Sequence, residues 1–200
     1  GSKEYFIPLL GAHQITNATT AIAAIDALAV QGLAVTEEHI EAGLRDLVVP
    51  GRMQVLTSDK AGAPRIVVDA AHNHESAQVL ADTLKSTFGV ESCVFVVGLN
   101  SDKNVSAIWK ELSGLSRVCI ATKSNNIRSM KPEEIADVIC MLGTRKEDAI
   151  ACESVSEAIE KALEIAEDGE VICVTGSMYV VGEAREHVLK DKAWELAYTV

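Results

Sequence analysis

A carboxylate, an imidazole and an amide follow one apolar run at close spacing, as Asp69, His72 and Asn73. Asp69 offers two acceptor oxygens at a fixed place, which suits the paired hydroxyls of a ribose. Another apolar run ends at Gly176 and Ser177, where a tight turn leaves a hydroxyl and backbone N–H groups at the start of a helix. Such groups hold an anion, either a carboxylate or a phosphate. A simpler interpretation stays open, in which these polar residues only cap helices.

Two further segments bring positive charge to turns. Asp102 and Lys103 follow a third apolar run, and they are interpreted either as a phosphate contact or as a solvated surface pair. Arg52 stands next to Gly51, where a guanidinium can hold a phosphate with two parallel hydrogen bonds, although a lone arginine is also common on surfaces. Surface or helix-capping roles are expected for His39, His74 and His187.

Recognisable phosphate-loop and nucleophile motifs are absent from the sequence. It contains no Gly-x-x-x-x-Gly-Lys-Ser/Thr, no Gly-x-Gly-x-x-Gly and no Gly-x-Ser-x-Gly. Metal-ligating side chains do not cluster at helical spacing and the five cysteines show no paired spacing, so no metal site is expected. Buried free thiols are expected instead, which favours a reducing compartment, either the cytoplasm or the interior of an organelle.

The elements that position these side chains alternate regularly from about residue 65 onward. Continuous apolar runs without strict alternation are typical of strands covered on both faces. Strands are predicted at 65–69, 93–97, 117–121, 149–152 and 171–175, and helices at 75–88, 105–112, 132–141, 155–167 and 178–189. This alternation predicts an α/β fold with a doubly wound, mostly parallel sheet. The polar segments then lie beyond the carboxyl ends of strands, where ligands bind in such sheets.

The first fifty residues have a different pattern. An Ala-rich helix is predicted at 17–31 and a second helix, opened by a capping segment at Thr36, runs to about Leu47. A turn at 50–51 and a first strand at 53–57 follow. We therefore divide the chain into a helical linking segment, 1–50, and an α/β domain, 51–200. The leading Gly1 and Ser2 are interpreted as a cloning remnant and are excluded from the fold prediction.

The composition excludes several classes of protein. Of the 200 residues, 48% are hydrophobic and 24% are charged, as in ordinary soluble globular chains. Lys and Arg number 18 against 29 Asp and Glu, so the net charge is −11 and a nucleic-acid partner is not expected. The apolar runs are too short to span a bilayer, so no membrane partner is expected.

Taken together, the polar segments resemble motifs of the folylpolyglutamate synthase and dihydrofolate synthase family, in the Mur-ligase superfamily. The matching pieces, in order, are Gly-Ala-His-Gln-Ile-Thr-Asn at 11–17, Pro-Gly-Arg at 50–52, Asp-Ala-Ala-His-Asn at 69–73, Gly-x-x-x-Asp-Lys at 98–103, Ile-Arg at 127–128 and Thr-Gly-Ser-Met-Tyr at 175–179. The resemblance is to the C-terminal domain of that family, so it implies a Rossmann-like Mur-ligase C-terminal fold for 51–200.

This resemblance implies an ATP-dependent ligase that joins L-glutamate to a folate. ATP phosphorylates a folate carboxylate to an acyl phosphate, which the amine of glutamate attacks, and groups that bind phosphate stabilise the developing charge. The resemblance assigns nucleotide binding to three residues: Asn17 lies near the adenine, Arg52 reaches the terminal phosphate and Asp69 holds the ribose.

The same resemblance assigns the incoming glutamate to His72 and Ser177, with Asn73 and Lys103 as further candidates for contact. For Lys103 an ordering role in its loop is the alternative. It assigns no catalytic residue to this chain alone. ATP and Mg²⁺ are expected to be bound mainly by an N-terminal ATPase domain of the family, which is therefore an expected partner, and the 200 residues alone are expected to be inactive.

The sequence also departs from the family pattern in four places. Ala70 stands where the family usually has Gly, His74 and Asn126 where it usually has Pro, and Val49 where it commonly has Trp. These departures favour an alternative function, a standalone non-catalytic homologue that binds folate, glutamate or a protein. A third interpretation is a sister Mur ligase that joins other amino acids in cell-wall synthesis.

Overall fold

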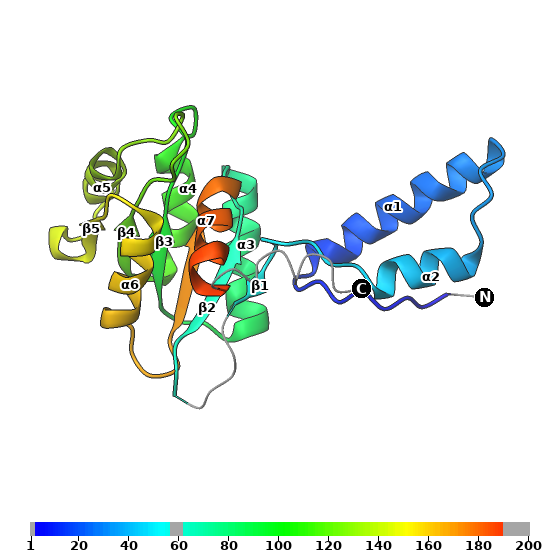
Figure 1. Cartoon of the computed structure of the whole chain (residues 1–200), viewed down its shortest axis with the longest axis horizontal. Coiled ribbons are helices and arrows are strands. Elements are labelled where there is room, and N and C mark those ends of the chain that lie inside the picture. The colour runs from blue at the N-terminus through cyan, green and yellow to red at the C-terminus, as the bar shows by residue number, and fades with distance from the viewer. Residues whose placement is uncertain (1–2, 57–61, 190–200) are drawn as a thin grey trace.

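A computed structural model describes residues 3–56 and 62–189, and in this part of the chain a six-stranded sheet has helices on both faces (Figure 1). The strands are β1 Gln54–Val55, β2 Arg65–Asp69, β3 Cys93–Val97, β4 Ser116–Ala121, β5 Ala149–Ala151 and β6 Val171–Thr175. The helices are α1 His13–Val30, α2 Glu37–Arg45, α3 His74–Phe88, α4 Val105–Leu112, α5 Pro132–Met141, α6 Val155–Ile165 and α7 Met178–Leu189. Single turns of 3₁₀ helix, η1 Ser113–Leu115 and η2 Lys146–Asp148, precede β4 and β5.

The strand order β1-β2-β6-β3-β4-β5 places the last strand in the sequence between β2 and β3. Every neighbouring pair is parallel except β1 and β2, which are antiparallel. Because β2 and β6 are parallel and in register from Arg65 opposite Val171 to Asp69 opposite Thr175, their carboxyl ends lie at the same edge of the sheet. The doubly wound, mostly parallel fold predicted from the sequence is confirmed.

Alternate residues of each strand face two separate apolar cores. Val67 and Phe95 belong to the core formed with α3, α4 and α5, whereas Val68 and Val96 belong to the core formed with α6 and α7. Since both faces of the sheet are covered, the strands are apolar throughout, as the sequence pattern indicated. All five cysteines are free, and four of them are buried, as predicted.

Two glycines allow the ends of β6 and β3 to approach closely. Gly176 has a φ of +108°, and a Cβ atom placed on it would lie 2.3 Å from the carbonyl oxygen of Gly98. A Cβ atom on Gly98 would lie 2.6 Å from a methyl group of Val180 in α7. Any side chain at Gly176 would therefore separate the two strand ends that shape this edge of the sheet.

Several element boundaries differ from the predicted ones. The first helix begins at His13 rather than at 17, because its N-terminus has no side-chain cap that the sequence could reveal. The second helix ends at Arg45 rather than near 47, and helix α6 ends at Ile165 rather than at 167. The predicted first strand, 53–57, is reduced to Gln54–Val55, and residue 57 lies outside the described residues.

Helices α1 and α2 form an arm that projects from the α/β body (Figure 1). Residues 3–10 run along this arm, where Lys3 and Tyr5 both bond to Glu37 at the start of α2. Among residues 3–56 and 62–189, no helix combines the length and the apolarity needed to cross a bilayer. The arm meets the body near the start of α1, and that junction encloses the main cavity of the candidate site.

Candidate functional site

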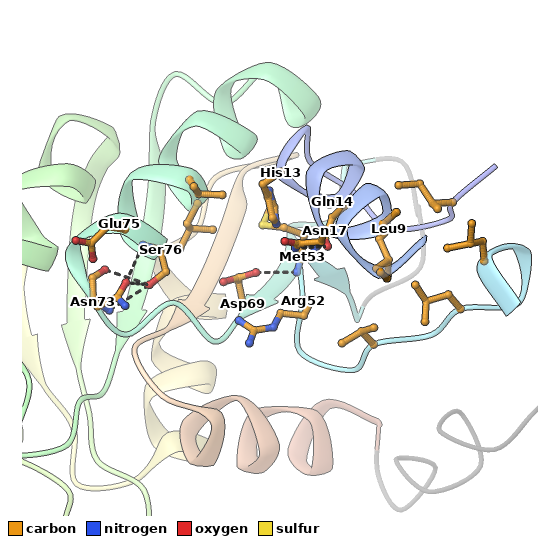
Figure 2. A pocket seen from close by; sticks show the side chains of 18 residues that line it. Leu9, His13, Gln14, Asn17, Arg52, Met53, Asp69, Asn73, Glu75 and Ser76 are labelled. Atoms are coloured by element: carbon orange, nitrogen blue, oxygen red, sulfur yellow. Dashed lines mark hydrogen bonds between the residues drawn. The ribbon is translucent and has the colours of Figure 1, made fainter. Parts of the chain in front are cut away.

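A cavity of about 610 Å³ lies between the arm and the carboxyl end of β2 (Figure 2). The body contributes Arg52, Asp69 and Asn73 to its wall, and α1 contributes His13 and Asn17. Gln14 of α1 and the first turn of α3, at Glu75 and Ser76, add further polar groups. The remaining lining is apolar and comes from Ile7, Leu9, α1, α3 and the segment 44–53. The cavity therefore pairs an apolar end with a charged end, which is the usual composition of a site for a small organic ligand.

Asp69, the last residue of β2, is the most buried charged group of this wall. The residue is only 8% exposed, and its two carboxylate oxygens accept hydrogen bonds of 2.9 Å from the backbone N–H groups of Met53 and Ala71. Burial raises the pKa of Asp69, and the two backbone donors and the charges of Arg52 and His13 oppose that rise. Each oxygen keeps a further acceptor position, so the carboxylate can still receive a ligand hydroxyl.

Arg52 is placed beside this carboxylate by a turn that is fixed at several points. Gly51 has a φ of +74°, and a Cβ atom on it would lie 2.7 Å from Val181 of α7. The carbonyl of Gly51 accepts from the N–H of Ala70 at 3.0 Å. Met53 has a φ of +43°, unusual for a residue with a side chain, and its N–H bonds to Asp69. The turn and the end of β2 thus form one unit that presents a guanidinium to the cavity.

The arm supplies the opposite wall through the first turn of α1. Asn17 is exposed to the cavity, and its amide donates to the side-chain oxygen of Gln14 at 3.1 Å. His13 also lines the cavity, with a buried Nδ1 that has no hydrogen-bond partner among the described residues. His13 and Gln14 belong to the Gly-Ala-His-Gln motif, but the sequence predicted no role for them. Only the fold brings these two residues to the cavity beside the end of β2 (Figure 2).

His72 and Ser177 follow neighbouring strands and lie outside the lining of this cavity. The hydroxyl of Thr175 donates to the carbonyl of Ala71 at 3.3 Å, so the two segments run side by side beyond β2 and β6. Ser177 is buried, and its hydroxyl accepts from the N–H of Val180 in the first turn of α7 at 3.1 Å. Both residues therefore follow strands that end at the same edge of the sheet, and Ser177 caps α7, as the simpler interpretation of its segment proposed.

Asn73 caps helix α3, as the simpler interpretation of its segment proposed. Its side-chain oxygen accepts from the N–H of Ser76 at 2.8 Å, and the residue also lines the cavity. Lys103 does not line the cavity, and its ammonium group lies 3.0 Å from Asp102. Arg128 lies 3.2 Å from the same carboxylate, and these two cations lower the pKa of Asp102. Lys103 thus pairs with the adjacent Asp102, and both its substrate contact and its ordering role stay predictions.

A capping role is found for one of the three remaining histidines, His39. His39 accepts from the backbone N–H of Thr36 at the start of α2, and His74 begins α3 and lies 3.3 Å from Glu111. His187 pairs with Glu160 on the neighbouring helix. Within the described residues, no group of three or more His, Cys, Asp or Glu side chains is arranged to hold a metal ion.

Comparisons with known proteins identify the family of this chain. Residues 51–178 match the family described as Mur ligase, glutamate ligase domain. The dihydrofolate synthase/folylpolyglutamate synthase of Mycobacterium tuberculosis is 28% identical over 200 residues, covering 92% of this chain and 40% of that protein. A UDP-N-acetylmuramoyl-L-alanyl-D-glutamate–2,6-diaminopimelate ligase of Clostridium acetobutylicum is 31% identical over 196 residues, covering 96% of this chain and 38% of that protein.

A solved structure of Mycobacterium tuberculosis folylpolyglutamate synthase, complexed with ADP and AMPPCP, has the same fold. It superposes with a TM-score of 0.81 at 27% identity, and the match covers 93% of this chain and 42% of that one. The chain thus spans about two fifths of the length of these relatives.

Proposed function

The chain belongs to the family of Mur ligase glutamate ligase domains, and from this premise we propose that it is the C-terminal, glutamate-binding domain of an ATP-dependent folate ligase. The reaction is the addition of L-glutamate to a folate through an acyl phosphate. The observation that carries the proposal is the meeting of Asn17, Arg52 and Asp69, from three separate elements, in one cavity of about 610 Å³.

The cavity suits one end of a nucleotide. The apolar side chains near α1 and α2 offer a surface for a base, with the amide of Asn17 at hydrogen-bond reach of its edge. The free acceptor positions of Asp69 suit a ribose hydroxyl pair, and the guanidinium of Arg52 suits a phosphate. In this arrangement the charge of Arg52 stabilises the phosphate as negative charge develops on it during transfer.

The second position, at His72 and Ser177, is assigned to the incoming glutamate. Ser177 lies at the N-terminus of α7, where backbone N–H groups favour a carboxylate. Because β2 and β6 are neighbours in register, this position lies next to the nucleotide wall without overlapping it. The two substrates of an amide ligase would then meet at one edge of the sheet.

The partner proposed for this domain is an ATP-binding domain, with Mg²⁺ held mainly there. The family match begins at residue 51, which supports the proposed division into a linking segment, 1–50, and an α/β domain, 51–200. The other half of the nucleotide site would come from that ATP-binding domain. We therefore expect the 200 residues alone to bind nucleotide weakly, because an open half-site leaves much of the ligand in water.

Calorimetric titration with ADP tests the nucleotide assignment directly. Arg52→Met is expected to weaken binding about tenfold, the loss of one charge-assisted contact. The control is Arg145→Met, which removes an exposed arginine at the opposite edge of the sheet and should leave binding unchanged. Equal loss in both variants, or in neither, would refute the assignment. In a coupled assay with ATP, L-glutamate and a reduced folate, the wild-type chain alone should show no turnover above the blank.

A cell-wall ligase is the second candidate, because the diaminopimelate ligase relative is as similar as the folate enzymes. The two differ in the amino acid that the second position must accept. Titration of the chain with L-glutamate and with meso-diaminopimelate, in the presence of ADP, separates them. Tighter binding of L-glutamate supports the folate ligase, and tighter binding of diaminopimelate would replace it with the cell-wall reaction.

A further inference from the structure

A groove of about 320 Å³ runs past the edge strand β1. It is lined by the segments 8–10 and 47–49, where the arm meets the body, and by residues 52–55, and eight of these ten residues are apolar. We propose that residues 190–200 of this chain, which follow α7 in the sequence and lie outside the described residues, bind in this groove. The proposal adds a contact within the chain that the proposed function does not require.

The outer edge of β1 offers both apolar surface and backbone groups to a further segment. Within the described residues β1 has one neighbouring strand, β2, and the N–H of Leu56 donates to the carbonyl of Ile66 at 2.9 Å. Bonded positions alternate along an antiparallel pair, so the N–H and carbonyl of Val55 point away from β2, at the edge that borders the groove. Val55 is 38% exposed and Val48 is 57% exposed. An extended segment can bind here through backbone hydrogen bonds and apolar side chains.

The sequence after α7 has the pattern of such a segment. Large apolar or aromatic residues occupy every second position from 194 to 200, namely Trp194, Leu196, Tyr198 and Val200. A period of two is typical of a strand with one apolar face, because successive side chains of a strand point to opposite sides. Aromatic and β-branched residues of this kind are also favoured in strands. The pattern therefore predicts a segment whose apolar face matches the apolar lining of the groove.

The end of α7 lies beside β1, so this segment starts close to the groove. A Cβ atom on Gly51 would lie 2.7 Å from a methyl group of Val181, which places this part of α7 against the turn before β1. Leu189, about 12 Å further along the helix, packs against the apolar core that contains Leu56, the residue directly after β1. Eleven residues, 190–200, follow Leu189. Extended, they span up to about 36 Å, so they reach the groove without any movement of α7.

Arg185 of α7 supplies a second and independent reason to expect a partner at this place. Its Nε and one terminal nitrogen are buried and have no hydrogen-bond partner among the described residues. Arg185 lies one helical turn after Val181 and one turn before Leu189, on the same stripe of the helix. Buried guanidinium N–H groups require an acceptor, and a carboxylate is the strongest one. The segment after α7 contains two carboxylates that can act as this acceptor, Asp191 and Glu195.

The position of the groove gives the bound segment a role in shaping the candidate site. Five residues line both the groove and the cavity of that site, namely Leu9, Leu47, Val49, Arg52 and Met53. A segment in the groove therefore packs behind the turn that presents the guanidinium to the cavity. It also joins the segments 8–10 and 47–49 to β1, and so ties the base of the arm to the sheet.

Nuclear Overhauser effects in the methyl-labelled chain test the contact without any substitution. The indole ring of Trp194 should show such effects to the methyl groups of Val48 and Val55. A mixture of labelled and unlabelled chains separates contacts within one chain from contacts between two chains. If Trp194 showed no effects to the groove and had the chemical shifts of a free peptide of residues 190–200, the proposal would be overturned. Effects found only between chains would also overturn it, because a second copy would then occupy the groove.

Tryptophan fluorescence compares matched variants of the same chain. The chain has two tryptophans, and Trp109 is buried, so Trp109→Phe leaves the emission of Trp194 alone. This emission should lie at a shorter wavelength, and be quenched less by acrylamide, than that of the free peptide of residues 190–200. Val48→Glu, which puts a charge in the groove, should return both quantities to the peptide values. Leu163→Glu, at a partly exposed position of α6, is the control and should not; equal responses of the two variants would overturn the proposal.

The support given to the candidate site is measured with ADP, and this readout alone rests on the proposed function. Trp194→Ala combined with Leu196→Ala should weaken ADP binding about fivefold, because the cavity then spends less time in the form that binds. Met141→Ala, which removes an apolar side chain that is 83% exposed on α5, is the control and should leave binding unchanged. Wild-type affinity in the double variant would overturn the supporting role. A wild-type chain that fails to bind ADP would instead overturn the proposed nucleotide site, while the contacts of Trp194 still decide whether the segment binds in the groove.

Discussion

Helices α1 and α3 differ sharply in what holds them in place. Five of the 15 residues of α3 are buried, and the helix has an N-terminal cap at Asn73 and a C-terminal cap at Gly89, which adopts the left-handed conformation. Only Gln14 is buried among the 18 residues of α1, which has no side-chain cap. Packing stabilises α3, whereas the Ala-rich composition of α1 is the main source of its helicity.

Because of this difference, one wall of the cavity is held by the packed body, whereas the other wall belongs to a helix with few buried residues. The wall formed by Arg52 and Asp69 is tied into the sheet by backbone hydrogen bonds, whereas the wall on α1 belongs to an arm with apolar side chains open to solvent. Ile15 is 63% exposed and Val30 is 90% exposed. Under the proposed function, the ATP-binding domain would cover this arm and fix the second wall.

The largest effect is expected where the body is most tightly packed. Gly176→Ala places a Cβ atom 2.3 Å from the carbonyl of Gly98 and forces alanine to a φ of +108°. The free energy of unfolding should fall by roughly 4 kcal/mol. Urea denaturation followed by circular dichroism measures this. Gly114→Ala, which meets no atom within 4 Å, is the control and should change stability little; equal stability of the two variants would contradict the close approach.

Two leucines allow the packing of α3 and α1 to be compared by the same substitution. Leu84 in α3 is fully buried, whereas Leu28 in α1 is 46% exposed. Leu84→Ala should lower the free energy of unfolding by about 3 kcal/mol because it leaves a cavity in the core. Leu28→Ala should cost less than about 0.5 kcal/mol in the chain alone. If Leu28→Ala proved as costly as Leu84→Ala, α1 would be packed far better than the structure indicates.

The pH dependence of stability should show a smaller effect, which distinguishes Asp69 at the end of β2 from Asp102 after β3. Burial raises the pKa of Asp69, whereas Lys103 and Arg128 lower the pKa of the exposed Asp102. Asp69 therefore favours the folded state below its unfolded pKa, and this contribution is lost as the pH rises through its folded pKa. Asp102 acts in the opposite direction, and its contribution is lost as the pH falls. Carboxyl ¹³C titration should place the two pKa values on opposite sides of the ordinary Asp value; the reverse order would contradict the geometry.

The sequence predicted the body well because both faces of the sheet are covered. Strands such as 93–97 are apolar at every position, and helices such as 105–112 have clear caps, so their bounds coincide with the structure. The first strand was predicted too long because Met53 adopts a left-handed conformation to bond Asp69, a contact between residues 16 positions apart. No local pattern could reveal it.

The candidate site was predicted less completely, for a similar reason. Polar residues after strands identified Asp69 and Ser177 as residues of one edge, because parallel strands end together. The sequence did not show that β6 lies beside β2, which decides that His72 and Ser177 are neighbours. The sequence also did not show that the first turn of α1 lies beside the end of β2. No role could therefore be predicted for His13 and Gln14, which line the cavity.

Chemical-shift mapping of the ¹⁵N-labelled chain with ADP tests the central claim most directly. The backbone amides that shift should be those around Asn17, Arg52 and Asp69, on both walls of the cavity, and Arg52→Met should abolish most of the shifts. The amides near Arg117 and Arg145, which line a separate cavity, should stay unchanged. Shifts concentrated there, or shifts that persist undiminished in Arg52→Met, would contradict the assignment of the nucleotide to the junction of arm and body.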